Sequence, residues 1–590
     1  MIISLCIILS LSTNFNSNTQ VYSISDTVET TGEELDYIIS SPILIDEESD
    51  FTSLGFSGSG TNGDPYLITN LKIETTGGYA IRVTSVTSAF TIRDCYFKAN
   101  QYAVDINGPM TNKIIIENNT VVNSDNGLYL RYLDDLEIIN NTFQNCGFAS
   151  IRVSFTDGVK IINNTITGSE RVDISASESA TIVNNTCTNT GFIINANEAW
   201  YSNFEVENNM VNGKPLLFLA NPQDIVISDN IYGQIIVGDG NNVTVKDQFI
   251  ENTATPIYLN AVRGMHVHNC TCLYNHVSGI DVRGWDAVVE DCEVEGNEDY
   301  GIDVSTVINA EVSNCYVHHN NAGIYALGAD NSVFFNNSIE YNLGQGLRLQ
   351  SNSVVDVLNN TFTHNLDSIW SYNLENCTIA YNLFDYAPTG NYAIFLYFDC
   401  IYNIIHNNFF VNNNVGGGTQ VYDDGSNNLW YNPYTLIGNY YSDYSGTGPY
   451  NIEGSAGASD PYVIIDSTAP SVAAKSSDLE YTEEATGNTI YWQPFDQYPR
   501  FYQLLLDDSY IRVSYWRSYD IIIINVDGLD IGEHNYTAVF FDMAGNKFAS
   551  TILVTVNPVV PEFQSSNIIV LSLTIISIIS VSSILVKRKN

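Results

Sequence analysis

Alternating apolar and polar residues repeat along the chain from about Leu67 to Phe410, and each copy ends in an asparagine pair or a close relative of it. The pattern I/V-x-I/V-x-N-N-T-hydrophobic is clearest in Lys113–Val121 and returns in Leu136–Phe143 and Val159–Ile166. Alternation with a period of two in β-branched residues predicts short β-strands. The copies follow one another at steps of about 22 residues, which indicates stacked units that bury their apolar faces against their neighbours.

A second alternation follows a glycine in each repeat, as in Gly279–Val282, Gly301–Val304 and Gly346–Leu349. About three short strands and three turns fit into each repeat, as in one turn of a right-handed, single-stranded parallel β-helix of the pectate-lyase type. A leucine-rich repeat is the alternative solenoid, because residues 133–141 fit its leucine spacing. The other repeats lack the leading leucines and a helical return segment, so the pattern favours the all-β fold.

The second residue of each asparagine pair is predicted to point inward at a bend, where stacked amides hydrogen-bond to one another. The predicted column consists of Asn119, Asn141, Asn164, Asn185, Asn209, Asn230, Asn337, Asn360, Asn382 and Asn408. In the middle of the chain Cys270, Cys292 and Cys315 take the same place, and small buried thiols suit it. Their spacing follows the repeat, so free thiols are expected rather than a disulfide framework.

The repeat defines the predicted domains. Residues 24–66 are expected to cap a solenoid that runs over residues 67–466. Residues 467–558 lack the asparagine pairs and carry several short apolar alternations, which predict a small Ig-like or fibronectin-like β-sandwich.

Both ends of the chain carry apolar runs. Residues 1–23 have the length of a signal peptide, although basic residues are missing from its start. After a joint over residues 559–567, residues 568–586 are uncharged and long enough for a transmembrane helix, and the basic tail 587–590 follows. These features predict a single-pass protein of the cell surface, with its bulk outside, its C-terminus in the cytoplasm and the membrane as a partner through the C-terminal helix.

The charge balance narrows the choice of partners. Acidic residues outnumber basic ones 66 to 22, for a formal net charge of −44. Nucleic-acid binding is therefore not expected, because it requires clustered lysines and arginines to neutralise phosphates. The balance suits a solvated surface or the binding of divalent cations.

Several motifs together resemble a known family. They are Pro42–Ile45, Gly63–Ile68, the N-N-T turns, Asn439–Tyr444 and Asp460–Tyr462. They resemble archaeal members of the NosD-like, parallel β-helix repeat family, which is associated with carbohydrate-binding and sugar-hydrolysing domains. The resemblance implies a β-helix and a glycan partner. The copper-related label of the family comes from a periplasmic accessory protein.

The glycine-led strands of successive turns are predicted to place outward side chains in two columns along a strip about 24 Å long. The first column is Asp281, Asp303, Tyr325, Arg348, Trp370 and Phe395, and the second is Arg283, Ser305, Leu327, Gln350, Tyr372 and Tyr397. Aromatic faces suit sugar rings, and charged groups suit hydroxyl or uronate groups. The residues predicted to bind an extracellular polysaccharide, or a cell-surface glycan or protein, are Arg283, Tyr325, Trp370, Tyr372, Phe395 and Tyr397. The alternative is an ordinary solvated face.

Asp281 and Asp303 occupy equivalent places on adjacent turns. Their carboxyls are predicted to approach the roughly 5 Å separation of a retaining glycosidase pair, or to hold Ca²⁺ together. Arg283 and Arg348 are the candidates for the base or clamp of a lyase. Two close carboxylates should raise one pKa, as acid catalysis requires. The G-H-G and R-I-K motifs of polygalacturonases are absent, so two solvent-facing carboxylates are the competing interpretation.

A candidate metal site comes from the strand before the asparagine bend. His266 and His268 are predicted to point outward there, with Glu290 at the equivalent place on the next turn. Two imidazoles and a carboxylate suit Cu²⁺ or Zn²⁺. Three classes of function therefore remain open: a glycan- or partner-binding protein, a polysaccharide lyase or glycoside hydrolase, and a structural coat, adhesin or metal-binding protein.

Overall fold

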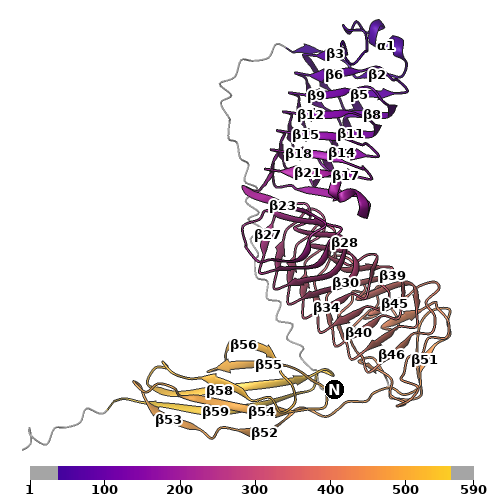
Figure 1. The fold of residues 1–590 in the computed structure, drawn as a ribbon. Coiled ribbons are helices and arrows are strands. Elements are labelled where there is room, and N and C mark those ends of the chain that lie inside the picture. Colours follow the sequence, from indigo (N-terminus) through magenta and orange to yellow (C-terminus); the bar gives the residue numbers. More distant parts are fainter. Residues whose placement is uncertain (1–36, 445, 560–590) are drawn as a thin grey trace, which may run out of the picture.

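The computed structural model describes residues 37–444 and 446–559. A long parallel β-solenoid is followed by a smaller β-sandwich, and Figure 1 shows the two as separate bodies joined by one connecting segment. Strands pair in parallel with the strand one turn later, as β12 (Leu136–Ile139) does with β9 (Ile114–Glu117) and β15 (Val159–Ile162). The predicted parallel β-helix is confirmed, and the repeats return through strands rather than through the helices of a leucine-rich repeat.

Each turn contributes to three faces, here called glycine-led, pre-bend and post-bend after the sequence pattern. The solenoid has two parts, and the first ends at β22. In this first part the glycine-led face consists of β2 (Ile43–Ile45), β5 (Tyr79–Thr84), β8 (Tyr102–Met110), β11 (Asn126–Leu133), β14 (Ala149–Ser154), β17 (Arg171–Ser175) and β20 (Phe192–Asn195). The pre-bend face adds β3 (Tyr66–Thr69), β6 (Phe90–Arg93), β18 (Ala180–Val183) and β21 (Phe204–Glu207) to β9, β12 and β15. The post-bend face is β1 (Ile38–Ile39), β4 (Leu71–Glu74), β7 (Tyr96–Lys98), β10 (Thr120–Val122), β13 (Thr142–Gln144), β16 (Thr165–Thr167), β19 (Thr186–Thr188) and β22 (Met210–Val211).

The second part repeats this arrangement. Its glycine-led face is β23 (Lys214–Ala220), β25 (Gln234–Gly238), the first halves of β28 (Ile257–His268) and β30 (Ile280–Glu290), β32 (Tyr300–Asp303), β36 (Ala322–Leu327), β39 (Leu347–Ser353), β42 (Ile369–Glu375), β45 (Ile394–Leu396) and β48 (Val421–Asp423). The pre-bend face is β24 (Gln223–Ile227), β26 (Asn241–Lys246), the second halves of β28 and β30, β34 (Glu311–Ser313), β37 (Val333–Phe335), β40 (Asp356–Leu358), β43 (Thr378–Ala380) and β46 (Ile404–His406). The post-bend face is β27 (Phe249–Glu251), β29 (Thr271–Leu273), β31 (Glu293–Glu295), β35 (Tyr316–His318), β38 (Ser338–Glu340), β41 (Thr361–Thr363), β44 (Leu383–Asp385), β47 (Phe409–Val411) and β49 (Tyr440–Tyr441).

The asparagine pairs form the bends. The first residue of each pair adopts a left-handed backbone, with φ of 55° at Asn118 and 55° at Asn140, a conformation that asparagine tolerates better than most residues. The second residue points inward, where the Asn141 Nδ2 donates to the Asn164 Oδ1 at 3.0 Å and to the Ile116 carbonyl at 2.8 Å. One dipeptide therefore encodes both a bend and one step of a buried amide ladder.

The predicted inward column is largely confirmed. Cys270, Cys292 and Cys315 are buried free thiols in the same column. The prediction for Asn230 is wrong: it lies exposed, and its Oδ1 accepts a hydrogen bond from the Phe249 amide. The reason is that the repeat is irregular just before this point, and the buried residue of the next bend is Gln248.

That irregularity divides the solenoid. The antiparallel pairing of β22 with β23 interrupts the parallel stack. The buried apolar residues form two clusters, one mainly in each part, although Ile236 and Tyr258 of the second part belong to the cluster of the first. The buried Gln234 side chain bridges the parts, since its Nε2 donates to the Phe192 carbonyl at 2.7 Å and to the Thr255 carbonyl at 2.8 Å. Figure 1 shows the two parts set at an angle near β23.

Four short elements complete the solenoid. Helix α1 (Glu48–Ser53) covers its first turns through the buried Phe51, whose ring centroid lies 4.4 Å from that of Tyr66. The others are the 3₁₀ helix η1 (Glu198–Asn203), the two-residue strand β33 (Val307–Ile308) and the hairpin of β50 (Tyr450–Asn451) and β51 (Ser459–Asp460).

Two sheets follow the solenoid and enclose a core of their own. One is β52 (Ser471–Lys475), β54 (Thr489–Phe495) and β57 (Ile522–Asn525), and the other is β53 (Leu479–Thr482), β59 (Lys547–Asn557), β58 (Gly532–Asp542), β55 (Pro499–Leu506) and β56 (Ser509–Tyr515). Trp492, Phe540 and Ile552 are fully buried between them. The structure thus contains a β-sandwich, whose Ig-like or fibronectin-like character stays a prediction.

The predicted signal segment, residues 1–23, and the predicted transmembrane helix, residues 568–586, lie outside the described residues. Among residues 37–444 and 446–559, no helix is long and apolar enough to cross a membrane.

Candidate functional site

The outward residues of the glycine-led face stack in the predicted register. Cα partners on successive turns form one unbroken column, which is Asp281, Asp303, Tyr325, Arg348, Trp370 and Phe395. In the second column Leu327, Gln350 and Tyr372 are also direct partners. The geometry of the strip is therefore as expected, and the functional roles of its residues remain predictions.

An acidic pair with a shared arginine lies at one end of this strip. The Arg283 guanidinium donates to both carboxylate oxygens of Asp281, at 2.9 and 2.8 Å, and its Nη2 lies 3.8 Å from the Asp303 Oδ2. Asp303 also accepts hydrogen bonds from the Ser305 amide and hydroxyl. Asp281 and Asp303 are only 4% and 5% exposed, so the interpretation as two solvent-facing carboxylates is wrong.

The surroundings of Asp281 and Asp303 favour the state in which the two carboxyls share one bound proton. Burial, followed by the Asp281 charge, raises the pKa of Asp303 to about 7, against the lowering effect of Arg283. Burial also raises the pKa of Asp281, which Arg283 opposes. Because the guanidinium binds Asp281 at two points, Asp281 is the ionised member and Asp303 the member that holds the proton.

Arg348 lies two turns beyond the acidic pair and does not contact it. Its guanidinium carbon is 5.2 Å from the ring centroid of Tyr325 and 5.2 Å from that of Trp370, within the range of cation–π attraction. Its Nη2 approaches the Gln350 Oε1 at 3.4 Å, whereas its Nε is enclosed without an acceptor among the described residues. The three predicted catalytic residues are therefore not together: Asp281 and Asp303 form an acidic pair, and Arg348 lies apart from them, between two aromatic rings.

Aromatic rings continue the strip. The Phe395 ring centroid lies 5.7 Å from that of Tyr397 and 4.8 Å from that of Tyr422, and Tyr397 lies 6.5 Å from Tyr372. Trp370 and these rings are partly exposed. The predicted residues therefore form an aromatic platform of which part of each ring reaches the surface.

The same face carries a second polar series in the first part of the solenoid, which the sequence argument missed. Asp105 lies 2.7 Å from the Arg82 guanidinium and 3.1 Å from that of Arg131. Asp173 is flanked in the same way by Arg152 and Arg171, at 3.8 and 3.7 Å.

Aromatic rings accompany these arginines. Arg131 and Arg152 lie 4.0 and 5.0 Å from the Tyr129 ring centroid, and the Nε atoms of both are enclosed without an acceptor among the described residues. A cavity of about 500 Å³ borders these three side chains. The signal was available in the sequence, since Tyr129 and Arg152 occupy the outward position of glycine-led strands.

The predicted metal ligands are brought together. The His266 Nε2 lies 2.7 Å from the Glu290 Oε1, and the His268 Nδ1 lies 3.4 Å from the same oxygen. One ligand atom from each of the three residues lies within 4.8 Å of the others. Asp291 adds a carboxylate 3.5 Å from the His268 Nδ1. The arrangement can hold a transition-metal ion, and whether it does so stays a prediction.

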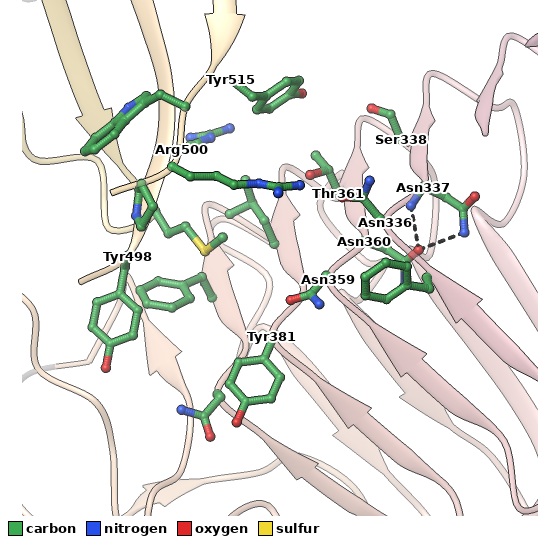
Figure 2. Close-up of a pocket in the computed structure, with 18 of the residues that line it drawn as sticks. Asn336, Asn337, Ser338, Asn359, Asn360, Thr361, Tyr381, Tyr498, Arg500 and Tyr515 are labelled. Carbon is green, nitrogen blue, oxygen red and sulfur yellow. Dashed lines mark hydrogen bonds between the residues drawn. The ribbon is translucent and has the colours of Figure 1, made fainter. Parts of the chain in front are cut away.

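A cleft between the solenoid and the sandwich was not predicted. It encloses about 710 Å³, and Figure 2 shows Asn336, Asn359 and Thr361 of the solenoid facing Arg500 and Tyr515 of the sandwich. These residues are too far apart in the sequence for a local pattern to connect them.

An ion pair joins the two walls of this cleft. The Arg500 Nη2 lies 2.6 Å from the Asp385 Oδ2. An apolar cluster beside it unites Leu383 and Phe409 of the solenoid with Tyr498 and Met543 of the sandwich.

Two family models match different parts of the chain. The one described as "Right handed beta helix region" matches residues 219–306 and 256–410, and the one described as "Periplasmic copper-binding protein (NosD)" matches residues 17–216. The matches support the NosD-like parallel β-helix family. They also support the predicted hand of the solenoid. The candidate ligands His266, His268 and Glu290 lie outside the stretch that the copper-binding description matches.

Several solved structures are similar to the chain. The A-module of the Azotobacter vinelandii mannuronan C-5 epimerase AlgE4 has 10% identity, a TM-score of 0.29, and coverage of 60% of this chain and 91% of that chain. The periplasmic alginate epimerase AlgG has 10% identity, a TM-score of 0.23, and coverage of 66% and 89%. PfbA, a surface adhesin of Streptococcus pneumoniae, has 10% identity, a TM-score of 0.15, and coverage of 71% and 91%. A search of curated proteins finds no significant match.

The predicted localisation is corrected by these findings. The matched NosD description names a periplasmic protein and not one of the cell surface. The single-pass cell-surface topology is therefore not supported. The archaeal origin and the Ig-like module of the resemblance remain predictions.

Proposed function

We propose that this protein binds a glycan along the glycine-led face of its solenoid. Support comes from the platform of partly exposed rings, in which Trp370 and Phe395 lie on adjacent turns with Tyr372 and Tyr397 beside them, and Tyr325 lies one turn before Arg348. Flat aromatic faces pack against the C–H faces of sugar rings, and a repeat spacing of about 4.8 Å presents a new side chain along the length of an extended polymer.

The observation that carries this proposal is the position of Arg348. Its guanidinium lies between the Tyr325 and Trp370 rings, and its enclosed Nε has no acceptor among the described residues. An unpaired buried donor is costly unless a ligand supplies an acceptor. Hydroxyl or carboxylate oxygens of a sugar stacked on Trp370 would supply one.

Glycan-array binding of the full chain tests the proposal. Trp370→Ala and Arg348→Gln should each weaken binding to the recognised glycan by about tenfold, because each removes a contact worth roughly 1–2 kcal/mol. Tyr434→Ala is the matched control, because Tyr434 is 91% exposed and lies away from the strip. Absence of binding to any glycan, or equal loss in the control, would refute the proposal and favour a structural or adhesive role.

A second candidate is a polysaccharide lyase or glycoside hydrolase, and one observation favours it. The buried Asp303 has a pKa raised to about 7 beside the arginine-bound Asp281, which suits a general acid near neutral pH. Turnover of uronate-containing or neutral polysaccharides that is lost in Asp281→Asn and in Asp303→Asn would select this function. No turnover of any substrate would rule it out.

A further inference from the structure

The cavity of about 500 Å³ on the first part of the solenoid is a trough along its glycine-led face. Its floor consists of small polar side chains, because the outward column that begins with Arg131 continues through Ser154, Ser175 and Asn195. These residues belong to β11, β14, β17 and β20, and Figure 1 shows the first three of these strands one below another. Strands pair at about 4.8 Å, so four turns give the trough a length of roughly 14 Å.

Aromatic and charged side chains border this floor on both sides. Tyr129 and Arg152 lie in the neighbouring outward column, where they are Cα partners on adjacent turns. Tyr132 and Phe155 border the cavity on the other side, and their rings stack with centroids 5.0 Å apart and planes 8° from parallel. The two residues are 50% and 55% exposed. They offer flat apolar faces of the kind that pack against sugar rings.

The backbone at these two rings is in an unfavourable conformation. Tyr132 and Phe155 are left-handed, with φ of 57° and 51°, a region that suits asparagine and disfavours bulky side chains. Because both rings are about half-exposed, burial offsets little of this cost in the free protein. Backbone strain of this kind is frequent at positions that contact a ligand.

Arg152 lines the trough with a guanidinium whose hydrogen-bonding capacity is unused. Its Nε is enclosed and has no acceptor among the described residues, and the Asp173 Oδ2 lies 3.8 Å away, beyond hydrogen-bond range. The Tyr129 and Phe148 ring centroids lie 5.0 and 5.1 Å from its guanidinium carbon, which holds the group by cation–π attraction. An enclosed donor without an acceptor is costly. A planar guanidinium binds a carboxylate or a similar oxyanion at two points.

The charge of the trough is opposite to that of the chain. Its lining contains Arg131 and Arg152 and no acidic residue, whereas acidic residues outnumber basic ones 66 to 22 in the whole sequence. Four arginines on this face share two aspartates, in the groups Arg82–Asp105–Arg131 and Arg152–Asp173–Arg171. Glu170, which lies 3.8 Å from Arg171, is outside the lining. A local excess of positive charge attracts anions to the trough.

We infer that the trough binds an acidic sugar unit, with its carboxylate or sulfate on the Arg152 guanidinium and its ring against Tyr132 and Phe155. The serine hydroxyls of the floor can donate to and accept from sugar hydroxyls. The inference builds on the proposed glycan binding, to which it adds an acidic ligand and a second site. It shares no residue with the platform around Trp370, so the two proposals can fail separately.

Calorimetry with the full chain and a trimer of galacturonic acid tests this inference, and a sulfated galactose trimer distinguishes sulfate from carboxylate as the bound group. The methyl-esterified galacturonate trimer is the matched ligand control, because it keeps the sugar rings and removes the charges. Arg152→Gln should weaken binding of the acidic trimer about tenfold or more, because it removes a charge-assisted contact at two points. Lys98→Gln removes the same charge from an exposed position of the post-bend face and should leave binding unchanged.

The variant Phe155→Asn separates ligand binding from folding. Asparagine suits the left-handed backbone of this position, so the thermal unfolding midpoint should stay the same or rise. Binding of the acidic trimer should nevertheless weaken about fivefold, because one face that packs against the sugar is lost.

The trimer is too short to reach from the trough to the platform, so Trp370→Ala distinguishes the two sites. Trimer binding that survives Trp370→Ala and is lost in Arg152→Gln supports the trough. The reverse result would overturn the trough and leave the proposed function intact. The inference would also be overturned if neither acidic trimer bound, if the methyl ester bound equally well, or if Arg152→Gln and Phe155→Asn bound like wild type.

Discussion

Asp281 and Asp303 are in-register partners on adjacent turns of the solenoid, and both are almost completely buried. A single guanidinium, that of Arg283, contacts the two carboxylates. One positive charge cannot neutralise two buried negative charges, so the pair holds a proton near neutral pH.

Stability should depend on pH through Asp303. Its pKa is about 7 in the folded chain and 3.8 ordinarily, so the folded state binds this proton more tightly than the unfolded state. The stabilisation is complete below about pH 4 and is lost as the pH rises through 7. We expect the thermal unfolding midpoint of the solenoid to fall between pH 5 and pH 8.

The variant Asp303→Asn isolates that contribution, because an amide stays neutral throughout. Its unfolding midpoint should fall less than that of wild type over the same pH range, by an amount that corresponds to about 2 kcal/mol. Asp508→Asn, at an exposed position of the sandwich, should follow wild type. An identical pH dependence in wild type and Asp303→Asn would contradict the assignment.

The buried amide ladder should be a major source of stability. The Asn360 Nδ2 donates to the Phe334 carbonyl and to the Asn382 Oδ1, and its Oδ1 accepts from the amide of Asn337. Asn360→Ala leaves several buried groups unpaired and should cost about 3 kcal/mol. Cys315→Ala, in the same column, should cost only about 1 kcal/mol, because it mainly removes a small apolar volume. Chemical denaturation measures the loss of unfolding free energy in each variant. Equal losses in Asn360→Ala and Cys315→Ala would show that the amide ladder adds little to stability.

The histidine cluster should bind a transition-metal ion. Titration calorimetry with Cu²⁺ or Zn²⁺ is expected to show one site that is lost in His266→Ala and in His268→Ala, because both imidazoles approach Glu290. Binding should weaken as the pH falls, since imidazole ligands must be unprotonated. His364→Ala, at an exposed position on the post-bend side, should keep the site. Unaltered binding in all three variants would place the metal elsewhere.

The ion pair across the cleft should hold the sandwich in place. The Arg500 and Asp385 side chains are 17% and 23% exposed, so replacing Arg500 by Met leaves a largely enclosed carboxylate unpaired, at a cost of about 1–3 kcal/mol. Faster limited proteolysis of the connecting segment, residues 461–470, is the expected result. Arg512→Met provides the control, because Arg512 is exposed on the same sandwich. This variant should leave the cleavage rate unchanged.

Much of the solenoid was predictable because its repeat places residues one period apart directly above one another. The columns Asp281–Asp303–Tyr325 and His268–Glu290 follow from counting along the chain. The amide ladder follows in the same way, since each bend needs a left-handed residue and a buried hydrogen-bonding side chain. A second ladder was overlooked because its asparagines lack the N-N-T context; it contains Asn275, Asn297, Asn320, Asn342 and Asn365.

Counting along the chain is enough to show which residues share a column, because similar turns pair by hydrogen bonds in a regular register. How deeply those residues are buried depends on the folded molecule, as the enclosed Asp281 and Asp303 demonstrate. The break beside β23 and the cleft at Arg500 also depend on the folded molecule. These features depend on contacts between bodies that follow no common period, and the free energy of such contacts cannot be read from the spacing of residues along one strand.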